Sequence, residues 1–403
     1  MRIYQNYHKH TYYTNPKVSD SIVSYADYGD RALELEHGII SSCEHGYQGR
    51  YIETFEEAQK RNLKFLFAAE AYWVNDRREQ DGTNCHIWIG AKNEAGRQAI
   101  NLALSEANLT GFYKQARLDR ELILGLPKND VWVTTACVAF WKYEDSDLFA
   151  EQLHEHFGNN FFLEVQYHNT DKQRDLNRHI IQLHERIKAP LIMGCDSHYI
   201  DRNGGADRDD FLLSKGMRYE DEDGWYLDYP DGDTAYNRFA DQCVLSHQQI
   251  VDAMDNTNVF LDVEEYDSPI FNQEIKMPSI YPDETQEFKN AEYEKLVWQG
   301  WSEYRDSVEP SKWPLYEQEI RKEVDIVTKT SMSDYFIDNY YIIKRGKELG
   351  GRLTKTARGS GSSFLTNKLL GFTEVDRLAA KVKMYPERFM SAERILETKS
   401  LPD

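Results

Sequence analysis

Short apolar runs alternate with longer segments of helical spacing through the first half of the chain. The apolar runs have the length of buried strands and occupy residues 3–8, 38–42, 64–69, 87–89, 131–135, 161–165 and 191–193. Between them, apolar residues recur at the spacing of a helix face over 22–36, 54–61, 94–108, 146–156 and 171–187. This alternation predicts an α/β fold with a parallel sheet and crossover helices, and roughly seven such units are enough to close a barrel.

The second half has a different pattern. Residues 202–268 are acidic and irregular, and helical spacing returns over 290–305 and 315–328. An aromatic-rich helix is expected from 334 to 350, where a pair of glycines provides a helix stop. The length of 403 residues also exceeds what one compact core accommodates, so we expect two domains or more.

The composition is that of a folded protein, with 40% hydrophobic and 13% aromatic residues. There is no apolar run of about 18 residues and no basic-then-apolar leader, so we expect no membrane span, no secretion and a cytoplasmic location. The five cysteines are widely spaced and include no Cys-x-x-Cys pair, which fits reduced thiols better than a disulfide framework.

The net charge of −20 should repel nucleic acid, but it hides two opposed segments. Residues 220–233 carry seven acidic side chains and no basic one, which is typical of a solvated loop. Residues 342–368 carry seven Lys or Arg and a single acidic residue, Glu348. This basic segment is a candidate for phosphate contact, and an ordinary solvated face is the alternative.

His8 and His10 end the first apolar run. Side chains alternate along an extended strand, so the two imidazoles should point the same way and Lys9 the opposite way. Neutral histidine is a common ligand for zinc and other borderline transition metals, and the pair therefore offers half of a metal site.

Other potential ligands fall at the ends of the expected strands. In barrels of alternating strands and helices, catalytic groups collect where the strand-to-helix loops meet. The further candidates are Asp20, His45, Glu70, His86, Cys137, Asp196 and His198. Most of them lie at such positions, but His86 opens its strand and Asp20 lies in a loop. A random scatter would not favour one end of a barrel, so we interpret these residues jointly as a metal site. His168 follows the strand at 161–165 and is a candidate for substrate contact.

Five histidines, three carboxylates and a thiol are too many ligands for one tetrahedral zinc. Two or three divalent ions with shared ligands would use them all, and clustered ions suit phosphoester hydrolysis. Manganese, zinc or iron fit this shell better than magnesium, which prefers oxygen ligands.

Several motifs together resemble the polymerase-and-histidinol-phosphatase (PHP) domain, in the form that begins the α subunit of bacterial DNA polymerase III. They are His8-Lys9-His10-Thr11, Asp20, Cys43-Glu44-His45-Gly46, Glu70, the run from His86 to Asn93, Cys137 and Asp196-Ser197-His198-Tyr199. The resemblance implies a distorted (β/α)7 barrel with a trinuclear metal centre. Its nine ligands would be His8, His10, Asp20, His45, Glu70, His86, Cys137, Asp196 and His198, and the full set implies a metal-dependent 3′-5′ exonuclease.

One residue departs from the family pattern. Glu44 stands where the family usually has Asp, and its longer side chain is expected to shift His45 and change metal preference.

The resemblance continues in the second half, as an α+β partial polymerase palm. The run from Ala357 to Ser363 lies in the basic segment, and glycines with small hydroxyls let backbone N–H groups approach phosphate. The apolar run that follows could also begin a helix whose N-terminus favours anions. The resemblance implies that this loop holds the triphosphate of a dNTP, through Lys355, Arg358, Gly359 and Ser360.

Asp403 matches the first of the palm carboxylates that bind magnesium for nucleotidyl transfer in this family. Transfer needs carboxylates on both ions, so we expect this chain alone not to synthesise DNA. Either the sequence is a truncated product, or the polymerase is split between genes and a second polymerase fragment is the partner. A phage or other mobile replicon would suit the loose matches to the family. The expected domains are the PHP barrel at 1–200, an acidic connection at 201–270 and the partial palm at 271–403.

Primer-template DNA and dNTP are the expected substrates, and replisome subunits are further candidate partners. Two alternatives remain open. The barrel could be a phosphatase for small substrates such as histidinol phosphate, or it could be a scaffold without catalytic activity that binds other replisome subunits.

Overall fold

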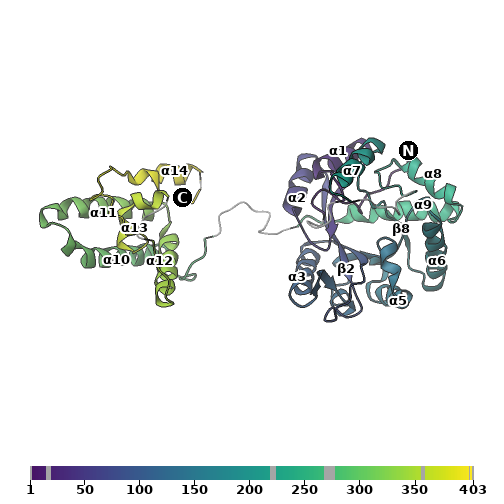
Figure 1. The fold of residues 1–403 in the computed structure, drawn as a ribbon, viewed down its shortest axis with the longest axis horizontal. Helices are drawn as coiled ribbons and strands as arrows, with labels where there is room; N and C mark the ends of the chain where they lie inside the picture. Colours follow the sequence, from purple (N-terminus) through teal and green to yellow (C-terminus); the bar gives the residue numbers. More distant parts are fainter. Residues whose placement is uncertain are drawn as a thin grey trace. The chain divides into compact units, whose positions relative to one another are not determined.

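The computed structural model of the protein describes residues 2–14, 20–217, 224–266, 277–354, 359–398 and 400–401. The chain forms two compact units, which we call unit 1 (Met1–Phe271) and unit 2 (Asn272–Asp403). Figure 1 shows the ribbon of each unit.

Unit 1 is built on one curved sheet of eight strands. The strands are β1 (Ile39–His45), β2 (Lys64–Trp73), β3 (Cys85–Ala91), β4 (Phe112–Tyr113), β5 (Gln115–Leu118), β6 (Val131–Thr134), β7 (Phe161–Val165) and β8 (Leu191–Met193). Their order is β4-β5-β2-β3-β6-β7-β8, and β1 also pairs with β2. The α/β class and the barrel-like curvature agree with the prediction from the apolar runs.

The sheet is not wholly parallel, and this part of the prediction was wrong. β3 runs antiparallel to both of its neighbours, β2 and β6, whereas β1 and β2, β6 and β7, and β7 and β8 pair in parallel. Residues 74–84 between β2 and β3 contain no helix, so the chain turns back beside β2 instead of crossing over.

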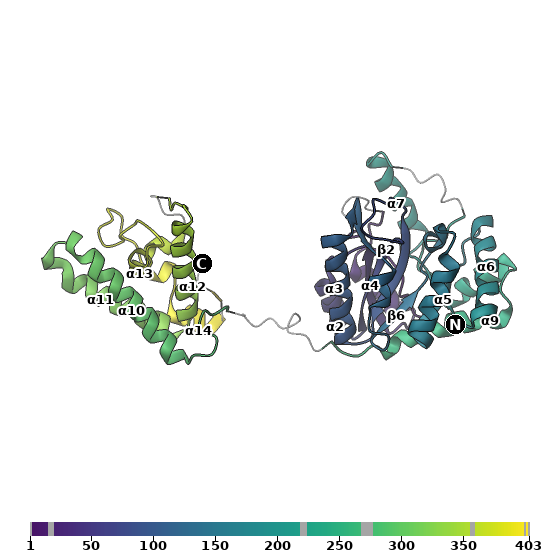
Figure 2. The ribbon, with the colours of Figure 1, turned by 90° about the horizontal axis from the view of Figure 1, so that it is seen from below.

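Helices cover the outer face of this sheet (Figures 1 and 2). They are α1 (Tyr25–Glu34), α2 (Tyr51–Lys60), α3 (Glu94–Thr110), α4 (Arg120–Leu124), α5 (Ser146–Phe157) and α6 (Asp171–Ile187). Capping side chains determine where several of these helices begin. The Asn93 side chain accepts a hydrogen bond of 3.0 Å from the Gly96 N–H and caps α3, for example.

The segment before α1 closes the sheet without forming a regular strand, although a strand was expected at 3–8. Lys9 makes an isolated parallel bridge with Ser197, supported by a hydrogen bond of 2.8 Å from the His10 N–H to the Ser197 carbonyl. On the other side, the Ser41 hydroxyl in β1 donates to the Tyr7 carbonyl at 2.8 Å. Residues 7–10 therefore lie between β1 and the segment that follows β8.

The segment expected to be an irregular acidic connection is largely helical. It contains α7 (Arg202–Ser214), α8 (Gly232–Gln242), α9 (His247–Asp255) and a 3-10 helix over Asn256–Asp262. Phe260 from this last helix is fully buried against the rings of Tyr7, Trp88 and Trp132, at centroid distances of 4.5, 5.1 and 5.2 Å. These residues complete the core of the barrel, which explains why unit 1 extends well beyond β8.

Unit 2 is helical in its described residues, where we expected a partial palm of helices and strands. Its helices are α10 (Gln286–Tyr304), α11 (Trp313–Lys329), α12 (Ser333–Glu348), α13 (Leu365–Leu369) and α14 (Ala392–Thr398). Its own core includes Phe336, Phe364 and Phe389, whose ring centroids lie 5.2–6.2 Å apart. α12 ends before Gly350, whose φ of 88° fits the expected glycine stop.

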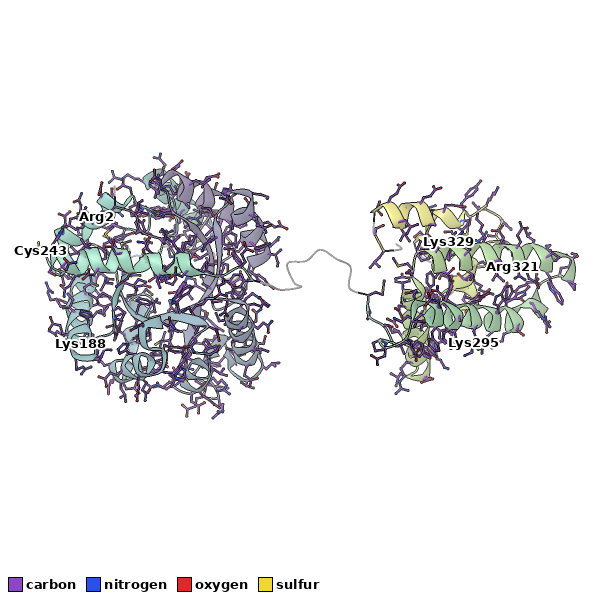
Figure 3. The ribbon with its side chains drawn as sticks, turned by 180° about the vertical axis from the view of Figure 1, so that it is seen from behind. Arg2, Lys188, Cys243, Lys295, Arg321 and Lys329 are labelled. Atoms are coloured by element: carbon purple, nitrogen blue, oxygen red, sulfur yellow. The ribbon has the colours of Figure 1, made fainter. Side chains whose placement is uncertain are left out.

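Charged side chains cover the outer surfaces of the long helices in unit 2. Lys295 on α10 and Arg321 and Lys329 on α11 are exposed (Figure 3). Within the described residues, no helix has the length and apolar character needed to cross a membrane. All five cysteines are free thiols, as expected.

Candidate metal centre

The strand ends of unit 1 bring all nine expected ligands together. His45 ends β1, Glu70 lies in β2, His86 lies near the start of β3 and Cys137 follows β6. His8 and His10 lie in the segment that closes the sheet, and Asp196 and His198 follow β8. Asp20 precedes α1. The nine side chains therefore come from distant parts of the sequence and meet at one edge of the sheet.

His86 lies near the start of its strand, whereas most of the other ligands were expected at the carboxyl ends of strands. The antiparallel direction of β3 explains its position. Tyr72, near the carboxyl end of β2, is the register partner of His86. The start of β3 therefore lies at the same edge as the ends of the parallel strands.

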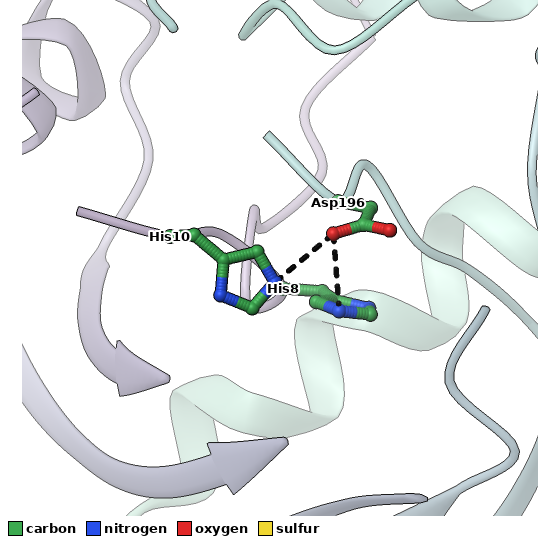
Figure 4. Close-up of side chains that lie close together, drawn as sticks. All are labelled: His8, His10 and Asp196. Atoms are coloured by element: carbon green, nitrogen blue, oxygen red, sulfur yellow. Dashed lines mark ion pairs between the residues drawn. The ribbon is translucent and has the colours of Figure 1, made fainter. Parts of the chain in front are cut away.

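His8 and His10 point toward the same carboxylate, as their alternation predicted. The Asp196 Oδ1 atom lies 3.4 Å from His8 Nε2 and 3.0 Å from His10 Nε2 (Figure 4). Lys9 points the opposite way and donates to the Ser41 hydroxyl at 2.6 Å and the Asn6 carbonyl at 3.0 Å. The φ of 48° at Asp196 is a left-handed conformation that Asp tolerates better than most residues, and it places this carboxylate at the turn after β8.

Glu70 is the centre of the cluster and is fully buried. Its Oε2 lies 2.6 Å from His45 Nδ1 and 3.4 Å from His10 Nε2. Its Oε1 lies 3.0 Å from His86 Nδ1 and 3.2 Å from His8 Nε2. One carboxylate thus faces four imidazoles.

Cys137, Asp20 and His198 complete the cluster. Cys137 Sγ is 3.5 Å from His86 Nδ1. His198 Nε2 is 3.4 Å from Asp196 Oδ1, and its Nδ1 is 3.5 Å from Asp20 Oδ1. Buried Arg208 on α7 donates to the Asp20 carbonyl and so anchors the loop that carries this ligand.

Eight polar atoms of this cluster have no partner in hydrogen-bond geometry. Buried polar atoms in proteins are nearly always hydrogen-bonded, so a group of orphaned atoms needs an explanation. The orphaned atoms are His8 Nε2, His10 Nε2, Asp20 Oδ1, His45 Nδ1, Glu70 Oε2, His86 Nε2, Asp196 Oδ1 and His198 Nδ1. Bound cations would satisfy these atoms, and the nitrogen, oxygen and sulfur donors suit manganese, zinc or iron.

In the part of the chain that the structure describes, three sets of ligand atoms are compact enough to hold an ion each, with all atoms of a set within 4.8 Å of one another. The sets are His8, His10 and Asp196; His10, His45 and Glu70; and Glu70, His86 and Cys137. His10 and Glu70 each belong to two sets, as bridging or shared ligands would. The geometry therefore fits a cluster of ions better than a single ion.

The cluster keeps its carboxylates ionised. Burial raises the pKa of the Glu70 carboxyl, but the charges of His86, His45 and His8 outweigh burial and hold that pKa well below its usual range. The pKa of Asp196 is lowered in the same way, since burial opposes ionisation but His8 and neighbouring imidazoles favour it more strongly.

The histidines respond in the opposite direction. Burial lowers the pKa of His8, but Glu164, Asp196 and Glu70 outweigh burial and raise the pKa well above its usual value. Burial likewise opposes protonation of His198, and Asp20 and Asp196 raise its pKa to about 9. In the absence of metal, protons therefore compensate part of the negative charge in the cluster.

Two residues near the site behave differently from expectation. The Glu44 carboxylate accepts hydrogen bonds of 2.5 Å from the hydroxyls of Thr11 and Tyr25. It therefore acts on the His10 segment through Thr11, because side chains alternate in β1 and Glu44 faces away from His45.

His168, the candidate for substrate contact, is fully buried and accepts a hydrogen bond of 3.1 Å from the Tyr226 N–H. This histidine supports the interior of unit 1.

Glu164 also lies at the site, although it was not among the expected site residues. This residue lies in β7, is 1% exposed and has its Oε1 2.9 Å from His8 Nδ1. A glutamate within the apolar run Phe161–Val165 was the available signal, because a buried strand rarely carries an unpaired carboxylate.

The candidate phosphate loop in unit 2 is described in part. Gly359 has a φ of 77°, which favours glycine, and Ser360–Ser363 form a 3-10 turn. A cavity of about 250 Å³ lies beside this turn, lined by Leu353, Thr354, Gly361, Ser362, Asn367, Phe372 and Thr373. Lys355, Arg358 and Asp403 lie outside the described residues.

The N-terminus of α13 binds an anion, as expected, but this anion is a carboxylate of the protein itself. The buried Glu323 carboxylate accepts hydrogen bonds from the N–H groups of Leu365 and Thr366, at 2.9 and 2.8 Å. Arg377 pairs with Glu323 at 2.6 Å. This carboxylate occupies the position that a phosphate would take.

Comparison with known families divides the chain in a similar way. The PHP domain matches residues 6–168, and the domain described as "Bacterial DNA polymerase III alpha NTPase domain" matches residues 291–403. The matches leave residues 169–290 between them.

Similar sequences carry the description DNA polymerase III subunit alpha. The protein from Campylobacter jejuni is 23% identical over 90% of this chain and 32% of its own length. Those from Helicobacter pylori strain 26695 and Borreliella burgdorferi are each 24% identical, over 100% and 98% of this chain and 35% and 34% of their own lengths. The chain thus spans about a third of the length of these relatives.

Two bacterial proteins are among the solved structures that match this chain. One, from Bifidobacterium adolescentis, is provisionally described as a metal-dependent phosphoesterase; it has 12% identity and a TM-score of 0.35, over 48% of this chain and 88% of its own. The other, an amidohydrolase from Chromobacterium violaceum, has 13% identity and a TM-score of 0.33, over 49% and 88%.

Proposed function

We propose that the chain is part of a DNA polymerase III α subunit, to which it is similar over nearly its whole length, and that unit 1 is a metal-dependent PHP phosphoesterase that removes nucleotides from the 3′ ends of DNA. The observation that carries this proposal is the convergence of nine ligand side chains, eight of which have a buried nitrogen or oxygen atom without a hydrogen-bond partner. A barrel that served only as a scaffold would gain nothing from such a cluster, because each orphaned polar atom costs stability.

The residues of the cluster have distinct roles in this proposal. Glu70 and His10, which each belong to two sets of ligand atoms, would help to hold more than one ion. The remaining side chains would hold the ions with them: Asp196, His8, His45, His86, His198, Asp20 and Cys137. When bound, clustered divalent ions lower the pKa of water and stabilise charge on the entering and leaving oxygens of a phosphoester. We propose manganese, zinc or iron as the ions, because the imidazole and thiol ligands suit them.

Unit 2 has a separate role in the proposal. Lys355, Arg358, Gly359 and Ser360 would bind the triphosphate of a dNTP beside the 250 Å³ cavity, and Asp403 would bind magnesium. Nucleotidyl transfer also needs further palm carboxylates, supplied by a longer chain or by a second polypeptide. Primer-template DNA is the proposed substrate of both sites, and replisome subunits are proposed partners.

An exonuclease assay tests the function of unit 1. Metal-free protein is reloaded with manganese or zinc and given a DNA duplex labelled at a recessed 3′ end, with His10→Ala as the inactive variant. We expect shortening of the labelled strand by the wild-type protein and at least 100-fold slower shortening by the variant, since catalytic metal ligands contribute several kcal/mol.

Two outcomes contradict the proposal. Turnover of a small phosphomonoester without action on DNA would favour a small-molecule phosphatase. Metal-loaded protein that acts on neither substrate would favour a scaffold.

A further inference from the structure

We propose that Glu164 is a positioning residue that fixes the tautomer of His8, so that His8 Nε2 offers its lone pair to a metal ion. This inference rests on the proposed metal-dependent function of unit 1. Glu164 is outside the nine-ligand set and comes from β7 beneath the cluster. It does not face the ions itself, because its partner atom is Nδ1, on the opposite side of the His8 ring from the metal-facing Nε2.

The Glu164 carboxylate has four partners. Its Oε2 accepts from the Tyr7 hydroxyl at 2.6 Å and the Thr134 hydroxyl at 2.9 Å. Its Oε1 lies 2.9 Å from Gln166 Nε2 and 2.9 Å from His8 Nδ1. An ionised carboxylate only accepts hydrogen bonds, so His8 must carry its proton on Nδ1 to complete this set.

A chain of hydrogen bonds that begins at the backbone fixes the orientation of Gln166. The Tyr226 N–H donates to His168 Nδ1 at 3.1 Å, so the proton of neutral His168 is on Nε2. That Nε2–H donates to Gln166 Oε1 at 3.2 Å, which leaves the Gln166 amide nitrogen to face Glu164. Each group in this series of hydrogen bonds therefore determines whether the next group donates or accepts, up to His8.

The backbone leaves space for this arrangement at Gly194. A Cβ atom added at Gly194 would stand 2.0 Å from Glu164 Oε1, well inside contact distance. Gly194 follows β8, two residues before the ligand Asp196. Any side chain there would push the Glu164 carboxylate out of its place under His8.

Cobalt titration of metal-free full-length chain tests the proposal. Visible absorbance reports both Co²⁺ affinity and ligand geometry. Glu164→Gln keeps the shape of the side chain and removes the acceptor charge, and we expect 10- to 100-fold weaker Co²⁺ binding with an altered absorption spectrum, the usual loss when such a partner is removed. Glu57→Gln is the matched control, because Glu57 on α2 pairs with Lys60 and Arg61 away from the cluster.

A purely structural role for Glu164 predicts a different result. It would lower the unfolding temperature of the metal-free protein while the folded protein kept wild-type Co²⁺ affinity and spectrum, and that result would overturn the proposal. If Glu164→Gln does not fold, Glu164→Asp gives the same comparison: it keeps the charge but withdraws the carboxylate from His8, and wild-type affinity would again overturn the proposal. Absence of Co²⁺ binding by the wild-type protein would instead contradict the proposed function itself.

Discussion

His86 Nδ1 lies 3.0 Å from Glu70 Oε1, although His86 opens its strand and Glu70 lies late in the neighbouring one. The antiparallel pairing of β2 and β3 makes this contact possible. It gives Glu70 its fourth imidazole, and it makes this carboxylate the residue on which most of the cluster depends.

Glu70→Gln should therefore disrupt more than one metal position. The amide keeps the volume of the side chain but removes the charge that faces His8, His10, His45 and His86. We expect the variant to retain fewer ions per chain than the wild-type protein, measured by elemental analysis after dialysis. Glu57→Gln should retain the wild-type number, and full metal content in Glu70→Gln would mean that Glu70 is not a shared ligand.

Removal of metal should destabilise unit 1. An ion present at 100 times its dissociation constant stabilises the folded state by about 2.7 kcal/mol. When the ion leaves, the buried ligand atoms have no partner, and this destabilises the folded state. We expect a chelator to lower the unfolding temperature by several degrees, and added zinc or manganese to restore it. An unchanged melting curve after the chelator would indicate a site that binds no metal.

His37 should make the protein sensitive to acid. Burial, together with the charges of Lys9 and Arg31, lowers the pKa of His37 to about 3, while the unfolded chain binds this proton near pH 6.5. The contribution of neutral His37 to the free energy of unfolding is therefore present above pH 6.5. It is lost as the pH falls toward 3, by roughly 1.4 kcal/mol per pH unit.

Urea unfolding between pH 7 and pH 4 measures this effect. His37→Gln should show a free energy of unfolding that falls less steeply with pH than that of the wild-type protein. The slopes are compared, rather than the absolute stabilities, because the variant also loses the edge contact of His37 with Tyr4 at 4.5 Å. Equal slopes would contradict the assignment of a neutral buried His37.

Phe260→Ala should destabilise the barrel by about 3–5 kcal/mol, the usual cost of removing a fully buried phenylalanine. The ring fills the space among Tyr7, Trp88 and Trp132, so its loss leaves a cavity in the core. Phe112→Ala, at a position 59% exposed, is the control and should cost under about 1 kcal/mol. Equal effects in urea unfolding would mean that the residues around Phe260 are not part of the core.

The sequence predicted features that depend on local pattern. Strand and helix periods located β1 to β3, β6 to β8 and most helices of unit 1, and the alternation at His8 and His10 placed both imidazoles correctly. Features that depend on long-range pairing were missed. The direction of β3 is decided by its neighbours in the sheet, and the burial of Phe260 is decided by rings more than 120 residues away.

The contacts of Glu164 could not be predicted from the sequence either. A carboxylate in a strand becomes meaningful only when its partners are known, and Tyr7, His8 and Thr134 are all at least 30 residues away. The same holds for Glu323, whose carboxylate caps α13 from 42 residues earlier in the chain.

Elemental analysis of the purified wild-type chain, reloaded with manganese or zinc and freed of excess metal, tests the central claim most directly. Three sets of ligand atoms that share Glu70 and His10 predict two or three tightly bound ions per chain. A His10→Ala variant should hold fewer, because His10 belongs to two of the sets. A wild-type protein that retains no ion, or one ion unaffected by His10→Ala, would contradict the account of a shared metal cluster.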